Sequence, residues 1–164
     1  MKNLVSVGGP LSSSEVALRV VGPDLNPEEI TRLLNCAPSY SHRNGDIQIG
    51  KHTGTKVVKK SGLWRVNFEK KMPAELDTKI QYLLGSVTDD ILVWNNLAGR
   101  FSIDMFCGLF LNRTNEGCNI SPKTLLELGK RGIELSLDIY APDFDQDLDE
   151  RMNVARQAKN KPTH

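Results

Sequence analysis

Apolar and polar residues alternate in four stretches of the chain, and this period of two predicts four β-strands. In the stretch 15–21, Val16, Leu18 and Val20 share one face. The other stretches with this alternation are 63–69, 101–111 and 133–140. Each strand is therefore expected to bury one face and to leave the other face open.

Between these stretches the apolar residues recur at the three- and four-residue spacing of amphipathic helices. Two helices have a clear start, because Asn26-Pro27 and Ser121-Pro122 each join an N-cap residue to a proline at the first helical position. Apolar residues at helical spacing predict two more helical segments between residues 73 and 99.

The order of elements is strand, helix, strand, two helices, strand, helix, strand. Helical connections that return to a sheet favour an α+β fold, and we expect a ferredoxin-like two-layer sandwich with a mixed, mostly antiparallel sheet and helices on one face. Leu137 and Ile139 of the last strand are expected on the buried face. The predicted organisation is a flexible N-terminal segment (1–14), a single α+β domain (15–141) and a charged, partly disordered C-terminal tail (142–164).

Composition narrows the function classes only slightly. The 164 residues carry a net charge of +1, which gives no overall attraction to nucleic acid, membrane or highly charged substrates. No apolar stretch approaches the roughly 20 residues needed to span a bilayer, so no membrane partner is expected. The three cysteines form no CxxC pair, which is typical of a reducing compartment, and without a convincing signal peptide the cytoplasm is the expected location.

The open sheet face carries two carboxylates, Asp104 and Asp138, on strands that we expect to be neighbours. Such a pair would support acid–base chemistry or hold a divalent cation, so one alternative is a small-molecule-binding protein or a metal-assisted hydrolase. The interpretation that we favour is simpler, with solvated polar residues on an exposed face, paired with Arg19 or Arg65. We therefore assign no catalytic residue, no metal site and no cofactor.

A polar loop, with room for an edge hairpin, is expected after the first helix. His42, Arg43 and Asp46 lie together in it, and Cys36 precedes them, which would supply the parts of a nucleophile system. Cys36 falls at a helix C-terminus, however, where the helix dipole disfavours a thiolate. A turn in which Gly45 supplies a positive φ and Asp46 ties the backbone is the better interpretation.

A basic run between Lys51 and Lys60 in the same loop has the charge to contact phosphates. It contains no aromatic residue, and the open face offers only Phe106 and Tyr140 for stacking, beside several acids. A single-strand binder needs aromatic residues next to basic ones. Nucleic-acid binding is therefore disfavoured.

Four segments together resemble a known family: VVGPDLNPEEITRLLNCAPSYSHRNGD, SGLWRV, DMFCGLFL and SPKTLLELGKRGIELSLDIY. The most specific pieces are Arg43-x-Gly45-Asp46, Gly62-Leu63-Trp64 and the closing LSLDIY. Over residues 15–141 the chain resembles the bacterial proteins grouped as domain of unknown function 4279. The resemblance implies a small bacterial α/β protein and no particular reaction. Some small bacterial proteins of this kind resemble immunity proteins that neutralise a toxin.

We therefore predict a non-enzymatic protein-binding module, in its most concrete form an immunity-type protein that occludes a toxin or a regulatory partner. The mixed-charge open face and the loop beside it would contact the partner, and charge complementarity would supply specificity. An exposed edge strand would let two copies pair as a homodimer. The residues predicted to bind the partner are Arg19, His42, Arg43, Asp46, Arg65, Asp104, Phe106, Asp138 and Tyr140.

Overall fold

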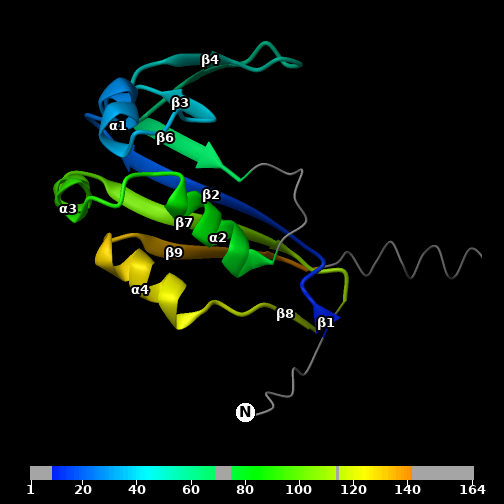
Figure 1. Ribbon diagram of the computed structural model, residues 1–164. Helices are drawn as coiled ribbons and strands as arrows, with labels where there is room; N and C mark the ends of the chain where they lie inside the picture. Colours follow the sequence, from blue (N-terminus) through cyan, green and yellow to red (C-terminus); the bar gives the residue numbers. More distant parts are fainter. Residues whose placement is uncertain (1–8, 69–74, 114, 142–164) are drawn as a thin grey trace, which may run out of the picture.

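A five-stranded sheet in the order β3-β6-β2-β7-β9 forms the centre of the protein (Figure 1). The computed structural model describes residues 9–68, 75–113 and 115–141. The strands of this sheet are β2 (Ser13–Gly22), β3 (Tyr40–His42), β6 (Gly62–Asn67), β7 (Ser102–Phe110) and β9 (Glu134–Tyr140). Two separate two-stranded sheets are β1 (Gly9–Pro10) with β8 (Glu116–Gly117) and β4 (Ile47–Ile49) with β5 (Lys56–Val58).

The strand β2 lies in the middle of the sheet and runs antiparallel to both of its neighbours. Arg19 of β2 lies opposite Arg65 of β6 on one side and opposite Asp104 of β7 on the other. β3 pairs antiparallel with β6, whereas β7 and β9 run parallel, with Gly108 opposite Asp138. The prediction of an α+β fold with a mixed, mostly antiparallel sheet is therefore confirmed.

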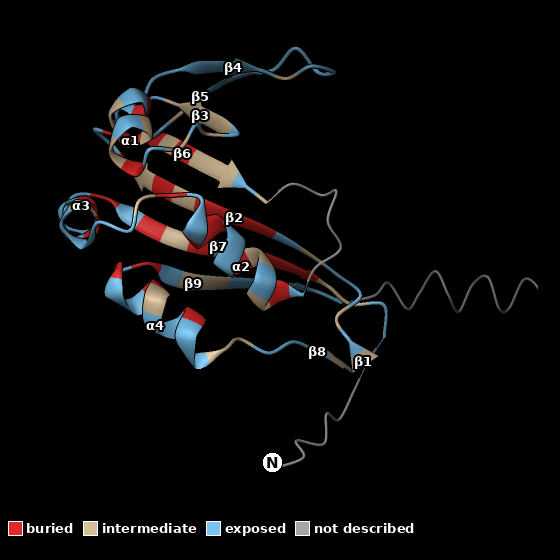
Figure 2. Cartoon of the chain, in the orientation of Figure 1, coloured by how far each residue is buried: buried red, intermediate tan, exposed pale blue. Residues whose placement is uncertain are grey.

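Within the described ranges, four helices pack on one face of the sheet: α1 (Pro27–Leu34), α2 (Leu76–Gly85), α3 (Ile91–Ala98) and α4 (Pro122–Lys130). Their buried residues and the apolar face of the strands form one core, in which Trp64 and Trp94 are fully buried. Figure 2 shows the buried residues concentrated on the central strands β2 and β7. Burial of apolar area, at about 25 cal/mol per Å², holds the helices to the sheet.

The two proline-marked helices begin where the sequence predicts. The side chain of Asn26 accepts a hydrogen bond from the backbone N–H of Glu28 at 3.1 Å. The hydroxyl of Ser121 accepts one from the backbone N–H of Thr124 at 3.3 Å. Each cap satisfies a donor at the start of its helix, and the proline that follows needs no acceptor.

The edge strand β9 departs from the prediction. Leu137 and Ile139 lie on the helix side of the sheet, as alternation predicts, but they are 49% and 61% exposed instead of buried. Leu135, near the start of β9, does pack against the core. Alternation identifies the face on which a side chain lies, whereas coverage of that face depends on where a helix ends. In this part of β9 no helix of the described chain covers the apolar face.

The polar loop predicted after α1 contains regular structure. It includes β3, which is an edge strand of the main sheet, and the β4–β5 hairpin. The segment predicted to be flexible, 1–14, includes β1 and the start of β2 within its described part, whereas the predicted tail, 142–164, lies outside the described residues. Among the described helices, none has both the length and the apolar character needed to cross a membrane.

Candidate functional site

The sheet face opposite the helices, here called the open face, carries mixed charges and aromatic rings. One row of side chains crosses it from β3 to β9: Tyr40, Arg65, Arg19, Asp104 and Glu134. Neighbours in such a row lie about 5 Å apart on adjacent strands and interact directly. The row changes from basic on β6 and β2 to acidic on β7 and β9.

An ion pair between Arg19 and Asp104 occupies the centre of this row. Arg19 donates through Nε to Asp104 Oδ1 at 2.8 Å and through Nη2 to Oδ2, so the pairing is bidentate. The same guanidinium lies over the ring of Phe106, 4.4 Å from its centroid. The hydrogen bond to Asp104 raises the pKa of Arg19. Asp104 is thus already engaged as an ion-pair partner, in agreement with the simpler interpretation of the sequence.

Arg65 has no comparable partner among the described residues. It lies directly opposite Arg19, and like charges in this position repel each other. Its guanidinium lies over the ring of Tyr40 at 5.4 Å, and its Nε is buried without a hydrogen-bond acceptor. No carboxylate of the described residues forms an ion pair with it. Arg65 is therefore a cation on the open face with unused donors.

His42, at the end of β3, adds a second unused polar atom near Arg65, at the β3–β6 end of the open face. Its ring makes an edge contact with Tyr40, with centroids 5.6 Å apart. Its Nδ1 is buried and has no hydrogen-bond partner. Tyr40, His42 and Arg65 therefore form a cluster at the β3–β6 end of the open face.

Arg43 and Asp46 shape the turn that follows β3. Asp46 accepts a hydrogen bond from the backbone N–H of Arg43 at 2.8 Å, and Gly45 has a φ of 85°. The Arg43 side chain pairs with Glu28 in the first turn of α1. Cys36 donates its weak S–H hydrogen bond to a neighbouring backbone carbonyl. The geometry therefore supports the turn interpretation and joins no nucleophile to a base among these residues.

The acidic end of the open face lies on β9. The hydroxyl of Tyr140 donates to Asp138 at 2.6 Å, and its ring stacks on Phe110 with centroids 4.8 Å apart. The hydrogen bond to Asp138 raises the pKa of Tyr140. Asp138 lies opposite Gly108, four residues along β7 from Asp104. At about 3.3 Å per residue, the two carboxylates are attached roughly 13 Å apart and do not converge.

The predicted site residues thus form two groups. On the open face lie Arg19, His42, Arg65, Asp104, Phe106, Asp138 and Tyr140, and in the turn after β3 lie Arg43 and Asp46. Within the described ranges, no group of three or more His, Cys, Asp or Glu side chains is arranged to hold a metal ion.

The β4–β5 hairpin projects beyond the β3 edge of the sheet (Figure 1). Three of its large apolar side chains lie on one face of the ribbon and are here called the hairpin patch: Ile47 (62% exposed), Ile49 (59%) and Val58 (57%). Val57, 51% exposed, lies on the other face, opposite Gln48. Ile47 lies directly opposite Val58 on the paired strand. Basic residues flank the patch: Lys51, Lys56, Lys59 and Lys60.

The hairpin patch was not predicted from the sequence, because the surrounding segment is polar overall. A signal was present, since Ile47-Gln48-Ile49 and Val57-Val58 are short β-branched runs on either side of a glycine-containing turn. Each run is only two or three residues long, which is too short to show a period of two.

Comparison with known proteins identifies one family. The family model described as Domain of unknown function (DUF4279) matches residues 12–142. No curated protein and no solved structure matches the chain. The matched region includes every strand of the main sheet and the β4–β5 hairpin.

Proposed function

Since the chain belongs to the family of domain of unknown function 4279, whose description assigns no activity, we propose from its surface that it is a non-enzymatic protein-binding module. The binding surface comprises the hairpin patch and the adjoining basic end of the open face. In its most concrete form, the partner is a toxin or a regulatory protein whose active site this chain occludes, as an immunity-type protein does. We place this activity in the cytoplasm of a bacterium.

The hairpin patch is the observation that carries the proposal. Its three β-branched side chains are more than half exposed on one face of a two-stranded ribbon. A two-stranded hairpin is marginally stable by itself, and exposed apolar patches are a feature of protein interaction sites. A partner that covers the patch would stabilise the ribbon by about 25 cal/mol for each Å² of apolar area removed from water. A protein surface supplies such area on a scale that a small solute does not.

The charges around the patch define the partner further. Lysines flank the hairpin. Arg65, at the neighbouring end of the open face, forms no ion pair with a carboxylate of the described residues. A partner with an apolar centre and an acidic rim complements both features. A partner carboxylate on Arg65 would form a charge-assisted hydrogen bond and would offset the repulsion from Arg19. Tyr140, 45% exposed at the other end, is suited to anchor a partner that extends across the face.

The alternative, a small-molecule binder or hydrolase using Asp104 and Asp138, has less support. Asp104 is paired with Arg19, and Asp138 accepts a hydrogen bond from the hydroxyl of Tyr140. Two carboxylates attached roughly 13 Å apart do not act on one reacting bond. Nucleic acid is also a poorer occupant than an acidic protein, because Asp138 and Glu134 at one end of the face would repel its phosphates.

The β9 edge is the place where we propose that two copies pair, as predicted from the exposed edge. An antiparallel pairing centred on Leu137 would place Leu137 opposite its own copy and Ile139 opposite Leu135, so that apolar residues meet. Leu137 and Ile139 are exposed in the single chain. Sedimentation should show a dimer that Ile139→Lys abolishes, and a monomer at all concentrations would exclude this pairing.

The ferredoxin-like assignment stays a prediction. A sheet with helices on one face agrees with it. The ferredoxin-like motif, however, joins two of its strands directly, whereas here a helix lies in every connection between β2, β6, β7 and β9. The solved structure of a family member with established fold relatives would decide the assignment.

A capture experiment with matched variants tests the proposed function. The tagged chain, Ile49→Asp and Leu126→Asp are each used to retain proteins from a nuclease-treated lysate of the native host. Leu126 is 56% exposed on α4, outside the proposed surface, so it matches Ile49 in exposure and in the chemistry of the change. A stoichiometric protein should be retained by the unchanged chain and by Leu126→Asp, and lost with Ile49→Asp. Equal retention by all three, or no stoichiometric protein, refutes the proposal.

The partner so obtained allows a second, quantitative test. Arg65→Gln should weaken its affinity about tenfold or more, because hydrogen bonds to charged groups contribute roughly 1.5–3 kcal/mol. The association rate should fall as salt is raised, since opposite charges steer the encounter. For an immunity-type role, any enzymatic activity of the partner should titrate to zero at one equivalent of this chain.

A further inference from the structure

A cavity of about 590 Å³ lies on the helical side of the protein, away from the open face. Its walls come from α2, from the α2–α3 connection and from α4, and we call it the α2–α4 cavity. The residues that line it include Ser86, Thr88, Asp89, Lys123, Glu127 and Arg131. This volume is within the range of small-molecule sites, which is about 300–1,000 Å³.

Arg131 is the unusual residue of this cavity, because its charged side chain is only 7% exposed. Its Nη1 donates to the backbone carbonyl of Glu127 at 3.1 Å and to the Glu127 carboxylate. Its Nε is buried without a hydrogen-bond partner, and within the described chain Nη2 has no acceptor either. A guanidinium has five N–H donors, and leaving buried donors unused is costly. Nη2 is therefore the donor that an acid group in the cavity can reach, whereas Nε has no accessible surface.

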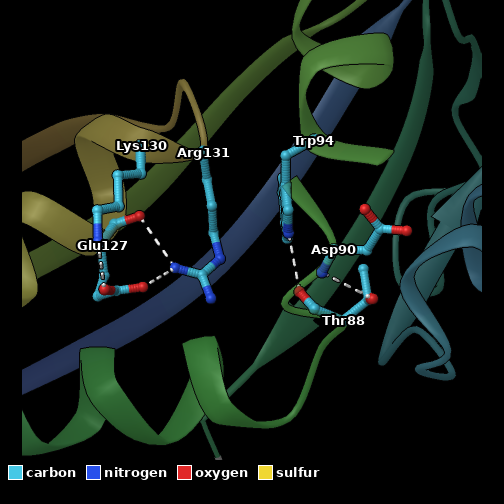
Figure 3. A network of polar contacts seen from close by, with 6 residues as sticks. All are labelled: Thr88, Asp90, Trp94, Glu127, Lys130 and Arg131. Carbon is cyan, nitrogen blue, oxygen red and sulfur yellow. Dashed lines mark hydrogen bonds and ion pairs between the residues drawn. The ribbon is translucent and has the colours of Figure 1, made fainter. Parts of the chain in front are cut away.

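The walls around Arg131 are held in place by their own contacts. Figure 3 shows Arg131 extending away from α4, with Glu127 on one side and Trp94 on the other. Trp94 donates to the backbone carbonyl of Thr88 at 2.8 Å, and its ring lies 6.0 Å from the guanidinium. The backbone N–H of Ser121 donates to Asp77 of α2 at 3.0 Å, which ties the start of α4 to α2. A cavity with fixed walls loses little freedom when it takes up a ligand.

The two sides of the cavity carry opposite charges. On α4, the single carboxylate of Glu127 pairs with both Arg131 and Lys130, and Lys123 pairs with no described carboxylate, so this wall has an excess of positive charge. The α2–α3 connection contributes Asp89, which forms no ion pair with any described residue. A ligand with an acid group at one end and an amino group at the other would satisfy both walls.

We propose that the α2–α4 cavity binds a small amino-acid-like zwitterion. Its carboxylate pairs with Arg131 and Lys123, and its ammonium group pairs with Asp89. The charge-assisted hydrogen bond from Nη2 of Arg131 to this carboxylate fixes the orientation of the ligand. A phosphate dianion fits less well, because Asp89 and Glu127 on the cavity walls would repel the second charge. The site lies on the opposite side of the sheet from the open face and is independent of the proposed partner.

Calorimetric titration of the full chain tests this site with the twenty common amino acids, one at a time. For the tightest of them, the analogue without the amino group, the analogue without the carboxyl group and inorganic phosphate are titrated as well. One amino acid should bind more tightly than its two analogues and than phosphate. If no amino acid binds with a Kd below about 10 mM, or if phosphate binds as tightly as the best amino acid, the proposal is wrong.

Matched variants locate the binding. Lys123→Gln and Asp89→Asn should each raise the Kd about tenfold or more, because each removes one charge-assisted contact. Lys130→Gln is the control, because it makes the same change in charge on α4 at a residue that does not line the cavity. Asp89→Asn should bind the acid without its amino group as well as the unchanged chain does. Equal losses with Lys123→Gln and Lys130→Gln would overturn the proposal.

The residue at the centre of the site needs a separate control, because removing a buried charged partner can unfold a domain. Arg131→Lys keeps the charge but loses the Nη2 donor, and it should weaken binding of the amino acid if it folds. Circular dichroism shows whether Arg131→Lys folds. If it does not, Lys123→Gln and Asp89→Asn decide whether the cavity binds the amino acid. None of these measurements involves a protein partner, so their failure would leave the proposed function untouched.

Discussion

Replacing Asp104 by asparagine tests the row of charges across the open face. The side chain keeps its size but loses the negative charge that Arg19 pairs with. Arg19 and Arg65 lie directly opposite each other on β2 and β6. The change therefore leaves two neighbouring guanidinium groups and removes the carboxylate that lies opposite Arg19 on β7. The native state should therefore lose stability, while the asparagine still accepts one hydrogen bond.

The expected loss in the free energy of unfolding is about 2 kcal/mol. Hydrogen bonds to charged groups contribute roughly 1.5–3 kcal/mol, and the pairing here is bidentate. The side chains of Arg19 and Asp104 are 32% and 20% exposed, so water screens part of the interaction. The value therefore lies between about 0–1 kcal/mol for surface pairs and about 3–5 kcal/mol for broken buried pairs. For a domain of this size, such a loss lowers Tm by roughly 6–10 °C.

Urea unfolding followed by tryptophan fluorescence measures this loss. Trp64 and Trp94 are both 0% exposed, so their emission should shift strongly when the core opens. Arg65→Gln provides the coupled variant, because it removes the second guanidinium of the pair on β2 and β6. In the unchanged chain it should leave stability within about 0.5 kcal/mol. In the Asp104→Asn chain it should restore about 0.5–1 kcal/mol by relieving the repulsion of Arg19.

Two results would refute this reasoning. A loss below about 0.5 kcal/mol for Asp104→Asn would place the ion pair among the surface pairs that contribute little. An equal effect of Arg65→Gln in both backgrounds would show that the two arginines are not coupled through the charge of Asp104. Either result would also weaken the proposal that a partner carboxylate binds Arg65 and offsets its repulsion from Arg19.

Three further predictions concern packing, pH and the hairpin. Gly62→Ala should lower the free energy of unfolding by about 2 kcal/mol in the same urea titration, because an added Cβ would lie 2.8 Å from Leu25 Cβ. Gly85→Ala is the control: an added Cβ would have nothing within 4 Å, so this variant should be neutral or stabilising by up to about 1 kcal/mol. Burial raises the pKa of Cys107 to about 12, so its contribution to the free energy of unfolding is fully present below the unfolded pKa of about 8.5. Above that pH the free energy of unfolding should fall by up to about 1.4 kcal/mol per pH unit, and Cys107→Ala should reduce this slope in unfolding curves from pH 9 to 10.5. Ile49→Asp, at a 59% exposed site, should change stability by no more than about 0.5 kcal/mol, and a larger loss would mean that the hairpin packs against the domain.

Features that depend on neighbouring residues in the chain were predicted correctly. The caps at Asn26 and Ser121 form because a side-chain oxygen meets a backbone N–H two or three residues later. The faces of β2 and β7 follow from alternation, since both strands are buried in the middle of the sheet. Arg19 and Asp104 were assigned to the same face, and their ion pair was one of the pairings expected there.

Features that depend on tertiary packing were not predictable in the same way. Leu137 and Ile139 alternate like core residues, but no helix of the described chain extends over them. Arg131 follows α4 just before Gly132, a position where an exposed basic residue is the usual expectation. Its burial results from Trp94 of α3, 37 positions earlier in the chain, whose ring lies beside the guanidinium. No local pattern encodes such a contact.

The two proposed sites face opposite sides of one sheet, and the chain joins them through a short connection. Arg131 in the α2–α4 cavity is followed by Gly132, with a φ of 64°, and by the buried Ile133, after which β9 begins at Glu134. Glu134 is the acidic end of the charge row on the open face. A ligand on Arg131 would change partner binding only if the two states of the cavity placed this start of β9 differently, since coupling requires a difference in affinity between two conformations. Because Ile133 is fixed in the core next to this connection, the structure favours two sites that bind independently.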